Sequence, residues 1–145
     1  MRKNAFHNYL DDEVLTAHPL RLVQLLYRGA LDSIASARRY LKLGEIRARS
    51  RAITKAMRIV TELARSLNMA EGGEVSRNLA RLYGYVLRLL MKANSEQSDA
   101  PLAEAERLLG ALAEAWDSAA QDSTAQENAS APVSEEDYEP LSCAY

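Results

Sequence analysis

A double glycine in the middle of the chain is the feature that most constrains its fold. Gly72 and Gly73 follow an apolar, periodic stretch that ends near Leu67, and a second such stretch begins at Glu74. Glycine often ends a helix, and an acid is favourable in the first turn of the next one. Both stretches repeat apolar residues every three or four positions, which is typical of amphipathic helices. The sequence therefore predicts a helical hairpin at this point.

Four segments show this helical spacing, at about 19–43, 45–67, 73–93 and from about 98 to beyond 116. Pro19 suits the first turn of the first helix, and Gly44 suits its end. A single phenylalanine and a single tryptophan are few for a large β-sandwich core. Because helices joined by short turns are neighbours, we predict an all-α fold, an antiparallel four-helix bundle over residues 19–120.

The two ends of the chain are predicted to behave differently from the bundle. Residues 1–18 contain the apolar Phe6, Tyr9 and Leu10, but the acidic run at 11–13 interrupts any long helix, so an irregular segment is expected. Residues 108–145 hold eight acids and no base. Beyond about residue 121 there is too little apolar surface to offset the entropy lost on ordering. We therefore expect a disordered acidic tail at 121–145.

The sequence offers little for catalysis or for binding a cofactor. Metal sites inside bundles use inward carboxylates with Glu-x-x-His pairs, and the only histidines, His7 and His18, are not in such pairs. Phosphate-loop, zinc and nucleophile-elbow spacings are also missing from the sequence. No apolar run approaches the ~18 residues of a membrane span. We expect a cytoplasmic protein that is neither an enzyme nor inserted in a membrane and needs no cofactor.

Three tyrosines suggest a binding surface instead. Tyr83 and Tyr85 are two positions apart on one helix and cannot both face the interior, so at least one should lie in a groove or on the surface. Exposed tyrosines beside apolar residues are good contacts for an amphipathic helix from a partner. We predict a groove lined by Tyr27, Leu63, Leu67, Val75, Leu79, Leu82, Tyr83 and Tyr85.

Two stretches, in the same order and at similar spacing, resemble the FliS family of flagellin-specific export chaperones. Residues 15–30 read LTAHPLRLVQLLYRGA, similar to the opening of the family's first helix. Residues 72–90 contain GGE, an Asn-Leu pair, a Leu-Tyr pair, a second tyrosine two positions later and an Arg-Leu run, similar to its third helix. The resemblance covers about residues 6–116 and leaves the acidic tail unmatched.

The resemblance implies a cytoplasmic four-helix bundle that binds the disordered C-terminal segment of flagellin. Such a chaperone prevents premature polymerisation and assists delivery to the export apparatus, without a cofactor. In the family, an N-terminal segment with an apolar residue and a tyrosine three positions later covers part of the groove. Phe6 and Tyr9 have this spacing, and with Leu10 they are expected to form a displaceable lid.

Two other functions stay open. Basic residues between Arg47 and Arg58 could bind RNA phosphates, and the steep salt dependence of phosphate binding would reveal this. Nucleic acid is not favoured, because this stretch lacks aromatic residues for base stacking and a solvated face explains it equally well. A helical adaptor for a flagellar regulatory protein, such as an anti-sigma factor, is the other alternative. Contact with the flagellar export gate is also compatible with the resemblance.

Overall fold

The structure is a computed structural model of the whole chain, and it describes residues 19–67, 69 and 72–142. Four helices make up this part: α2 (Pro19–Leu43), α3 (Ile46–Arg65), α4 (Gly73–Glu96) and α5 (Asp99–Ser142). The all-α prediction is confirmed, and so is each of the four predicted helices. The predicted lid at 1–18, with Phe6, Tyr9 and Leu10, lies outside the described residues.

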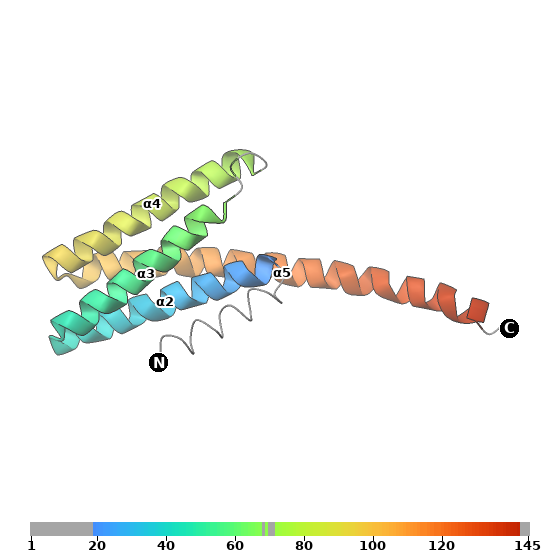
Figure 1. Cartoon of the computed structure of the whole chain (residues 1–145), viewed down its shortest axis with the longest axis horizontal. Coiled ribbons are helices and arrows are strands. Elements are labelled where there is room, and N and C mark those ends of the chain that lie inside the picture. Colours follow the sequence, from blue (N-terminus) through green and yellow to red (C-terminus); the bar gives the residue numbers. More distant parts are fainter. Residues whose placement is uncertain (1–18, 68, 70–71, 143–145) are drawn as a thin grey trace.

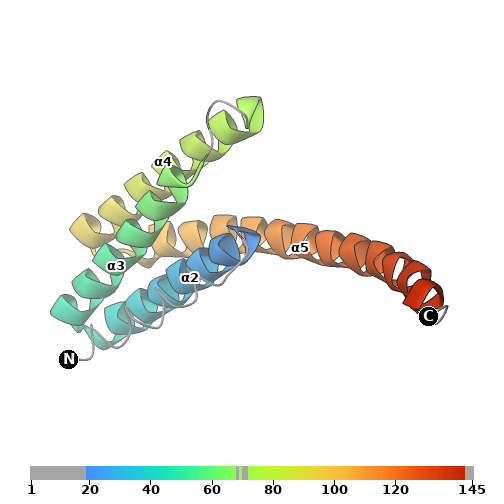
Figure 2. The ribbon, with the colours of Figure 1, turned by 45° about the vertical axis from the view of Figure 1, so that its right-hand side comes forward.

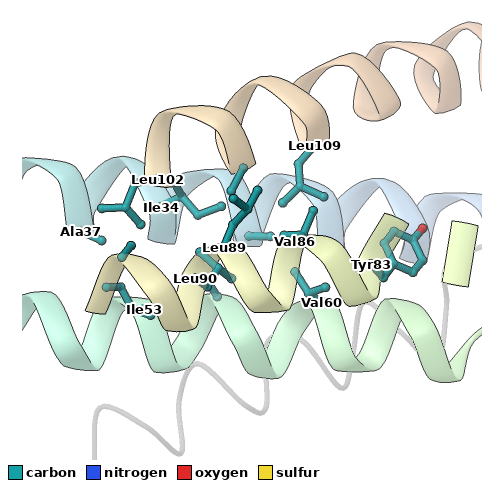
Figure 3. Packing of buried hydrophobic residues seen from close by; sticks show 14 of the residues in the cluster. Ile34, Ala37, Ile53, Val60, Tyr83, Val86, Leu89, Leu90, Leu102 and Leu109 are labelled. Carbon is teal, nitrogen blue, oxygen red and sulfur yellow. The ribbon is translucent and has the colours of Figure 1, made fainter. Parts of the chain in front are cut away.

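The four helices form a ring in which each one packs against two others. α2 contacts α3 and α5, and α4 contacts the same two helices. Consecutive helices run in opposite directions, as the colour sequence in Figure 1 shows. This arrangement places the apolar faces of all four helices around one shared core (Figure 3). The middle of the bundle is dry and well packed, with Ile34, Ile53, Val86 and Leu102 each at most 1% exposed.

Left-handed turns end two of the helices. At the end of α2, Gly44 has a φ of 70°, and the amide of Glu45 donates to the carbonyl of Tyr40 at 3.0 Å. This is the six-to-one hydrogen bond of a Schellman turn. At the end of α4, Gln97 has a φ of 52°, and Ser98 makes the equivalent bond to Ala93 at 3.3 Å. The second turn uses no glycine, so glycine placement alone does not reveal it.

A charged contact fixes α5 against α2. Arg38 donates through Nε and Nη2 to the two carboxylate oxygens of Asp99, at 2.8 and 2.9 Å, and through Nη1 to Glu106 at 3.1 Å. The hydrogen bond from Arg38 holds the pKa of Asp99 below its ordinary value. Because Asp99 lies in the first turn of α5, its charge also interacts favourably with the helix dipole. The contact therefore sets where α5 begins along α2.

α5 is longer than the four-helix core requires, because it continues to Ser142. Residues 111–131 are rich in alanine and also contain glutamate and glutamine, which favour helix. A helix already nucleated by packing can add such residues at little further cost. Pro132 and Pro140 oppose helix farther along, and the disordered acidic tail at 121–145 stays a prediction.

Candidate partner-binding surface

The end of the α3–α4 hairpin exposes apolar side chains. We call this surface the open tip and define it by Leu67, Met69, Val75, Leu79 and Leu82. Figures 1 and 2 show that the end of α3 and the start of α4 lie well away from α2 and α5. The hairpin diverges from the other two helices toward this end, so its inner face is less covered there.

Burial along α4 follows this divergence. Val75 and Leu82 are seven residues apart, close to two helical turns, and therefore lie on the same face as Val86 and Leu89. Val86 is fully buried and Leu82 is half-buried, whereas Val75 is 68% exposed. The apolar stripe of α4 is thus exposed at Val75, whereas the neighbouring Ser76 is 6% exposed and remains covered.

The same change occurs at the end of α3. Leu63 is only 1% exposed, Leu67 is half-buried, and Met69, in the connection to α4, is 49% exposed. Both helices of the hairpin therefore present apolar residues at their shared end. Contiguous exposed apolar residues of this kind are typical of interaction surfaces.

A pair of buried tyrosines marks the boundary between the closed core and the open tip. The hydroxyl groups of Tyr27 on α2 and Tyr83 on α4 are 2.5 Å apart, and either can be the donor. Their ring centres are 6.3 Å apart and the ring planes are inclined at 55°. The bond between the hydroxyls joins α2 to α4 at one level of the bundle, where Figure 3 shows Tyr83. Trp116, on α5, is among the partly buried residues packed against the same core.

Burial raises the pKa of both tyrosines. For Tyr27, hydrogen bonds from Tyr83 and Trp116 partly oppose this effect, whereas for Tyr83 the bond to Tyr27 adds to it. Both hydroxyls therefore stay neutral at physiological pH. They are polar groups satisfied inside an apolar core, which makes the contact specific in geometry.

Tyr85 lies elsewhere, on the side of α4 that faces α5. It is 36% exposed, and its hydroxyl donates to Glu104 at 2.6 Å. The guanidinium carbon of Arg88 is 5.9 Å from the centre of its ring, within the range of a cation–π contact. The hydrogen bond to Glu104 is the main cause that raises the pKa of Tyr85. The prediction that Tyr83 and Tyr85 cannot both face the interior is confirmed.

The structure divides the predicted groove residues into three groups. Tyr27, Leu63 and Tyr83 are core residues, at most 1% exposed, and form the floor beneath the open tip. Leu67, Val75, Leu79 and Leu82 lie on the two helices near the end of the hairpin. Leu67 and Leu79 are partly buried against the core, and Val75 is exposed. Tyr85 is instead bonded to Glu104 of α5. The role of the predicted residues as a partner-binding groove stays a prediction.

Sequence reasoning missed several exposed apolar residues. Met69 belongs to the open tip but falls in the expected turn, outside any periodic stripe. Leu43 and Ile46, 69% and 55% exposed, flank the α2–α3 turn, and Met91, 52% exposed, lies on the outer side of α4. Met91 lies between the basic residues Arg88 and Lys92 in the sequence, so nothing distinguishes it from an ordinary surface residue.

The described residues contain no group of three side chains suited to holding a metal ion. In the same part of the chain, no helix has both the length and the apolar character needed to cross a membrane. A surface hollow of about 300 Å³ lies between α2 and α3 and is lined mostly by polar and small residues, among them Asp32, Ser36 and Arg51. It does not include the open tip.

Comparison with known proteins identifies the family of this chain. Residues 2–123 match the family described as "Flagellar protein FliS". The chain belongs to the FliS family. The family resemblance found in residues 15–30 and 72–90 is therefore confirmed.

Several relatives are named as chaperones. "Flagellar secretion chaperone FliS" from Salmonella typhimurium is 35% identical over 108 residues, covering 74% of this chain and 80% of the relative. "Flagellar secretion chaperone FliSB" from Pseudomonas aeruginosa is also 35% identical, over 74% of this chain and 86% of the relative. "Flagellar secretion chaperone FliS" from Bacillus subtilis is 30% identical, over 82% of this chain and 88% of the relative. This chain is accordingly a non-enzymatic chaperone of the flagellar secretion system.

Proposed function

We propose that this FliS-family protein binds the C-terminal segment of flagellin in the cytoplasm, prevents its premature polymerisation and assists its delivery to the export apparatus. The observation that carries the proposal is Val75, which lies on the core-facing stripe of α4 and yet is 68% exposed. A residue on that stripe would normally be covered by another helix. The open tip is therefore suited to accept one from a partner.

An amphipathic segment is the natural ligand for such a surface. A helix that presents apolar residues at spacings of three, four and seven could pack between the two sides of the hairpin end and continue the bundle's own packing. Fully burying one Val, Leu or Met side chain contributes about 1.5–3 kcal/mol. Covering several residues of the open tip would therefore offset much of the entropy that a disordered segment loses when it folds on binding.

The buried tyrosines have a supporting role in this proposal. Tyr27 and Tyr83 are covered by protein, so they do not need to contact flagellin. By joining α2 to α4 they keep the bundle closed below the open tip. The surface for the ligand is thus held by rigid elements, which reduces the entropy lost on binding.

Calorimetry with the protein and its cognate flagellin tests the proposal. Full-length flagellin should bind, with a negative heat-capacity change from apolar burial, and flagellin without its C-terminal segment should not. Equal affinity for both forms of flagellin would refute the proposal.

A matched pair of substitutions tests the surface itself. Val75→Asp and Met91→Asp both place an acid at an exposed apolar position of α4, but only Val75 belongs to the open tip. Val75→Asp should weaken flagellin binding at least about tenfold, which corresponds to about 1.4 kcal/mol. Met91→Asp should leave binding unchanged, and both variants should unfold at temperatures near that of the parent. Equal loss of binding in both would place the ligand elsewhere.

The lid predicted at Phe6, Tyr9 and Leu10 extends the proposal to the N-terminus. If these residues cover apolar surface in the free protein, deleting residues 1–10 should expose that surface and increase the binding of an apolar dye. The deletion should also tighten flagellin binding, because the free energy needed to displace the lid no longer reduces the binding free energy. Unchanged dye binding and unchanged affinity would remove the lid from the proposal and leave the open tip untouched.

A further inference from the structure

The outer side of α3 carries a row of exposed cations. Its members, at spacings of three or four residues, are Arg47, Arg51, Lys55 and Arg58, and we call these four residues the basic face. The spacings keep them on one side of the helix, opposite the buried Ile53. From Arg47 to Arg58 the basic face extends roughly 17 Å, at about 1.5 Å per residue. It is therefore long enough to contact several anionic groups at once.

Charge is divided unequally between the two pairs of helices. Residues 19–65, which contain α2 and α3, hold eleven Lys and Arg against three Asp and Glu. Residues 73–120, which contain α4 and the start of α5, hold five Lys and Arg against seven Asp and Glu. The first pair thus has an excess of eight positive charges, and the second an excess of two negative charges. A negatively charged surface would orient the bundle with α2 and α3 toward it.

The basic face borders the hollow of about 300 Å³ between α2 and α3. Arg51 and Lys55 line its α3 side, and the hydroxyl-bearing Ser36 and Tyr40 line its α2 side. Guanidinium, ammonium and hydroxyl groups all donate hydrogen bonds to phosphate oxygens. Asp32 is the carboxylate among the described residues that line the hollow, and the two cations outnumber it. The hollow is therefore suited to a phosphate group.

An exposed leucine lies at the end of the same surface. Leu43, the last residue of α2, is 69% exposed. It follows Ser36 by seven residues and Tyr40 by three, so it lies on the side of α2 that borders the hollow. Lys42, next to it, is also exposed. Apolar side chains beside cations are typical of proteins that rest on an anionic bilayer, because the apolar groups enter the headgroup region while the cations contact the phosphates.

We propose that the basic face docks on the surface of an anionic lipid bilayer, with lipid phosphates at Arg51 and Lys55 and with Leu43 inserted between the headgroups. The protein lies on the bilayer and does not span it. The cations provide most of the attraction, so the contact is reversible and is weakened by salt. A nucleic acid would satisfy the cations but would give Leu43 no apolar surroundings. The contact uses no residue of the open tip and is independent of flagellin binding.

Vesicle flotation with the full-length protein tests the proposal. One set of vesicles is an equimolar mixture of phosphatidylglycerol and phosphatidylcholine, and the other is phosphatidylcholine alone. In 0.1 M NaCl the protein should bind the anionic vesicles at least ~10-fold more tightly. In 1 M NaCl, where the Debye length falls from about 10 Å to about 3 Å, this preference should be lost. Equal binding to both sets, or binding to neither, overturns the proposal. So does binding to RNA or to polyglutamate without binding to the vesicles, which would assign the basic face to a different anion.

A pair of charge reversals localises the contact. Arg51→Glu with Arg58→Glu reverses the centre of the basic face. Because each cation near an anionic bilayer contributes roughly fivefold to partitioning, this variant should bind the anionic vesicles at least ~20-fold more weakly. The control, Arg77→Glu with Arg81→Glu, makes the same charge change at exposed positions of α4 and should bind nearly as well as the parent. Equal loss of binding in both variants overturns the assignment to the basic face. Circular dichroism confirms that each variant is folded.

A neutral substitution tests the inserted leucine. Leu43→Gln and Met91→Gln both replace an exposed apolar residue by a polar, uncharged one that is favourable in helices. Leu43→Gln should weaken binding to the anionic vesicles at least ~5-fold, because part of the apolar area of this leucine leaves water when it inserts. Met91→Gln should bind as the parent does. Unchanged binding of Leu43→Gln, or equal loss in both variants, overturns the proposed docking on lipid.

Discussion

The hydroxyl pair of Tyr27 and Tyr83 allows a quantitative test of how the bundle is closed. The 2.5 Å bond joins α2 to α4. Replacing either tyrosine by phenylalanine keeps the ring and removes one oxygen. The effect on stability therefore reports hydrogen bonding inside the core with little change in packing volume.

The two single substitutions should have similar effects. Each one leaves the buried hydroxyl of the other tyrosine without its partner, so Tyr27→Phe and Tyr83→Phe should each cost about 1–3 kcal/mol of unfolding free energy. In the double variant no hydroxyl is orphaned, and its cost should be smaller than the sum of the singles by about 1 kcal/mol.

Urea unfolding at pH 7, followed by circular dichroism, measures all four proteins of this cycle. The m-values should be equal, because the surface exposed on unfolding hardly changes. Additive costs of the two single substitutions would refute the hydrogen bond between the two side chains. A large cost in the double variant would instead show that the rings shift when the oxygens are removed.

High pH gives the same cycle a second readout. The pKa of both tyrosines is raised by burial, so the neutral form is favoured in the folded state. Tyrosine in the unfolded chain ionises near about pH 10. The stability gained from the neutral pair is therefore complete below about pH 10 and is lost as the pH rises above it. In the double variant Tyr27→Phe with Tyr83→Phe, the unfolding free energy should therefore decrease less as the pH rises above about 10.

Three further predictions concern the ends of helices. Arg38 lowers the pKa of Asp99, so this contact stabilises the fold above about pH 4 and is lost as the pH falls further. Asp99→Asn should therefore lower the free energy of unfolding by less than about 1 kcal/mol at pH 7, since the side chain of Asp99 is 40% exposed. Near pH 2 the same substitution should cost almost nothing, and urea titration at both pH values measures the difference. Gly44→Ala should destabilise the protein by about 1 kcal/mol, because Gly44 has a φ of 70°. Gly110→Ala, inside α5 with open space around its Cβ position, should stabilise it by up to about 1 kcal/mol. If both substitutions shift the thermal unfolding temperature in the same direction, this reasoning is contradicted. A chain ending at Gln121 should lose less than about 1 kcal/mol in the same assay, because the core ends near Trp116.

Local signals in the sequence were sufficient for most of the helical architecture. Gly44 and Pro19 lie where helix-ending and helix-starting preferences place them, so the bounds of α2 were predicted to the residue. The spacing of Tyr83 and Tyr85 fixed their opposite environments, since a helix turns by about 100° per residue. In these cases the physical cause is contained within one helix.

The open tip could not be predicted in the same way. Periodicity assigns Val75 and Val86 to one face of α4, but it does not say whether another helix covers each of them. Coverage depends on how far the hairpin diverges from α2 and α5, which is set by packing across the whole bundle. The same limit applies to the turn at Gln97, where tertiary packing imposes a left-handed conformation that glycine would adopt more easily.

The structure suggests why one bundle can be stable and still expose apolar surface. The core from Ile53 to Val60 is covered by four helices, and the Tyr27–Tyr83 contact closes it toward the open tip. On the core side of this contact, the helices cover one another's apolar side chains without a ligand. Above it, the stripe of α4 continues through Leu82 to Val75 without a covering partner. A variant that closed the hairpin against α2 would gain burial and lose the surface, so greater stability should accompany weaker flagellin binding. The exposure of Val75 is therefore expected to follow from the chaperone function and not from a defect in packing.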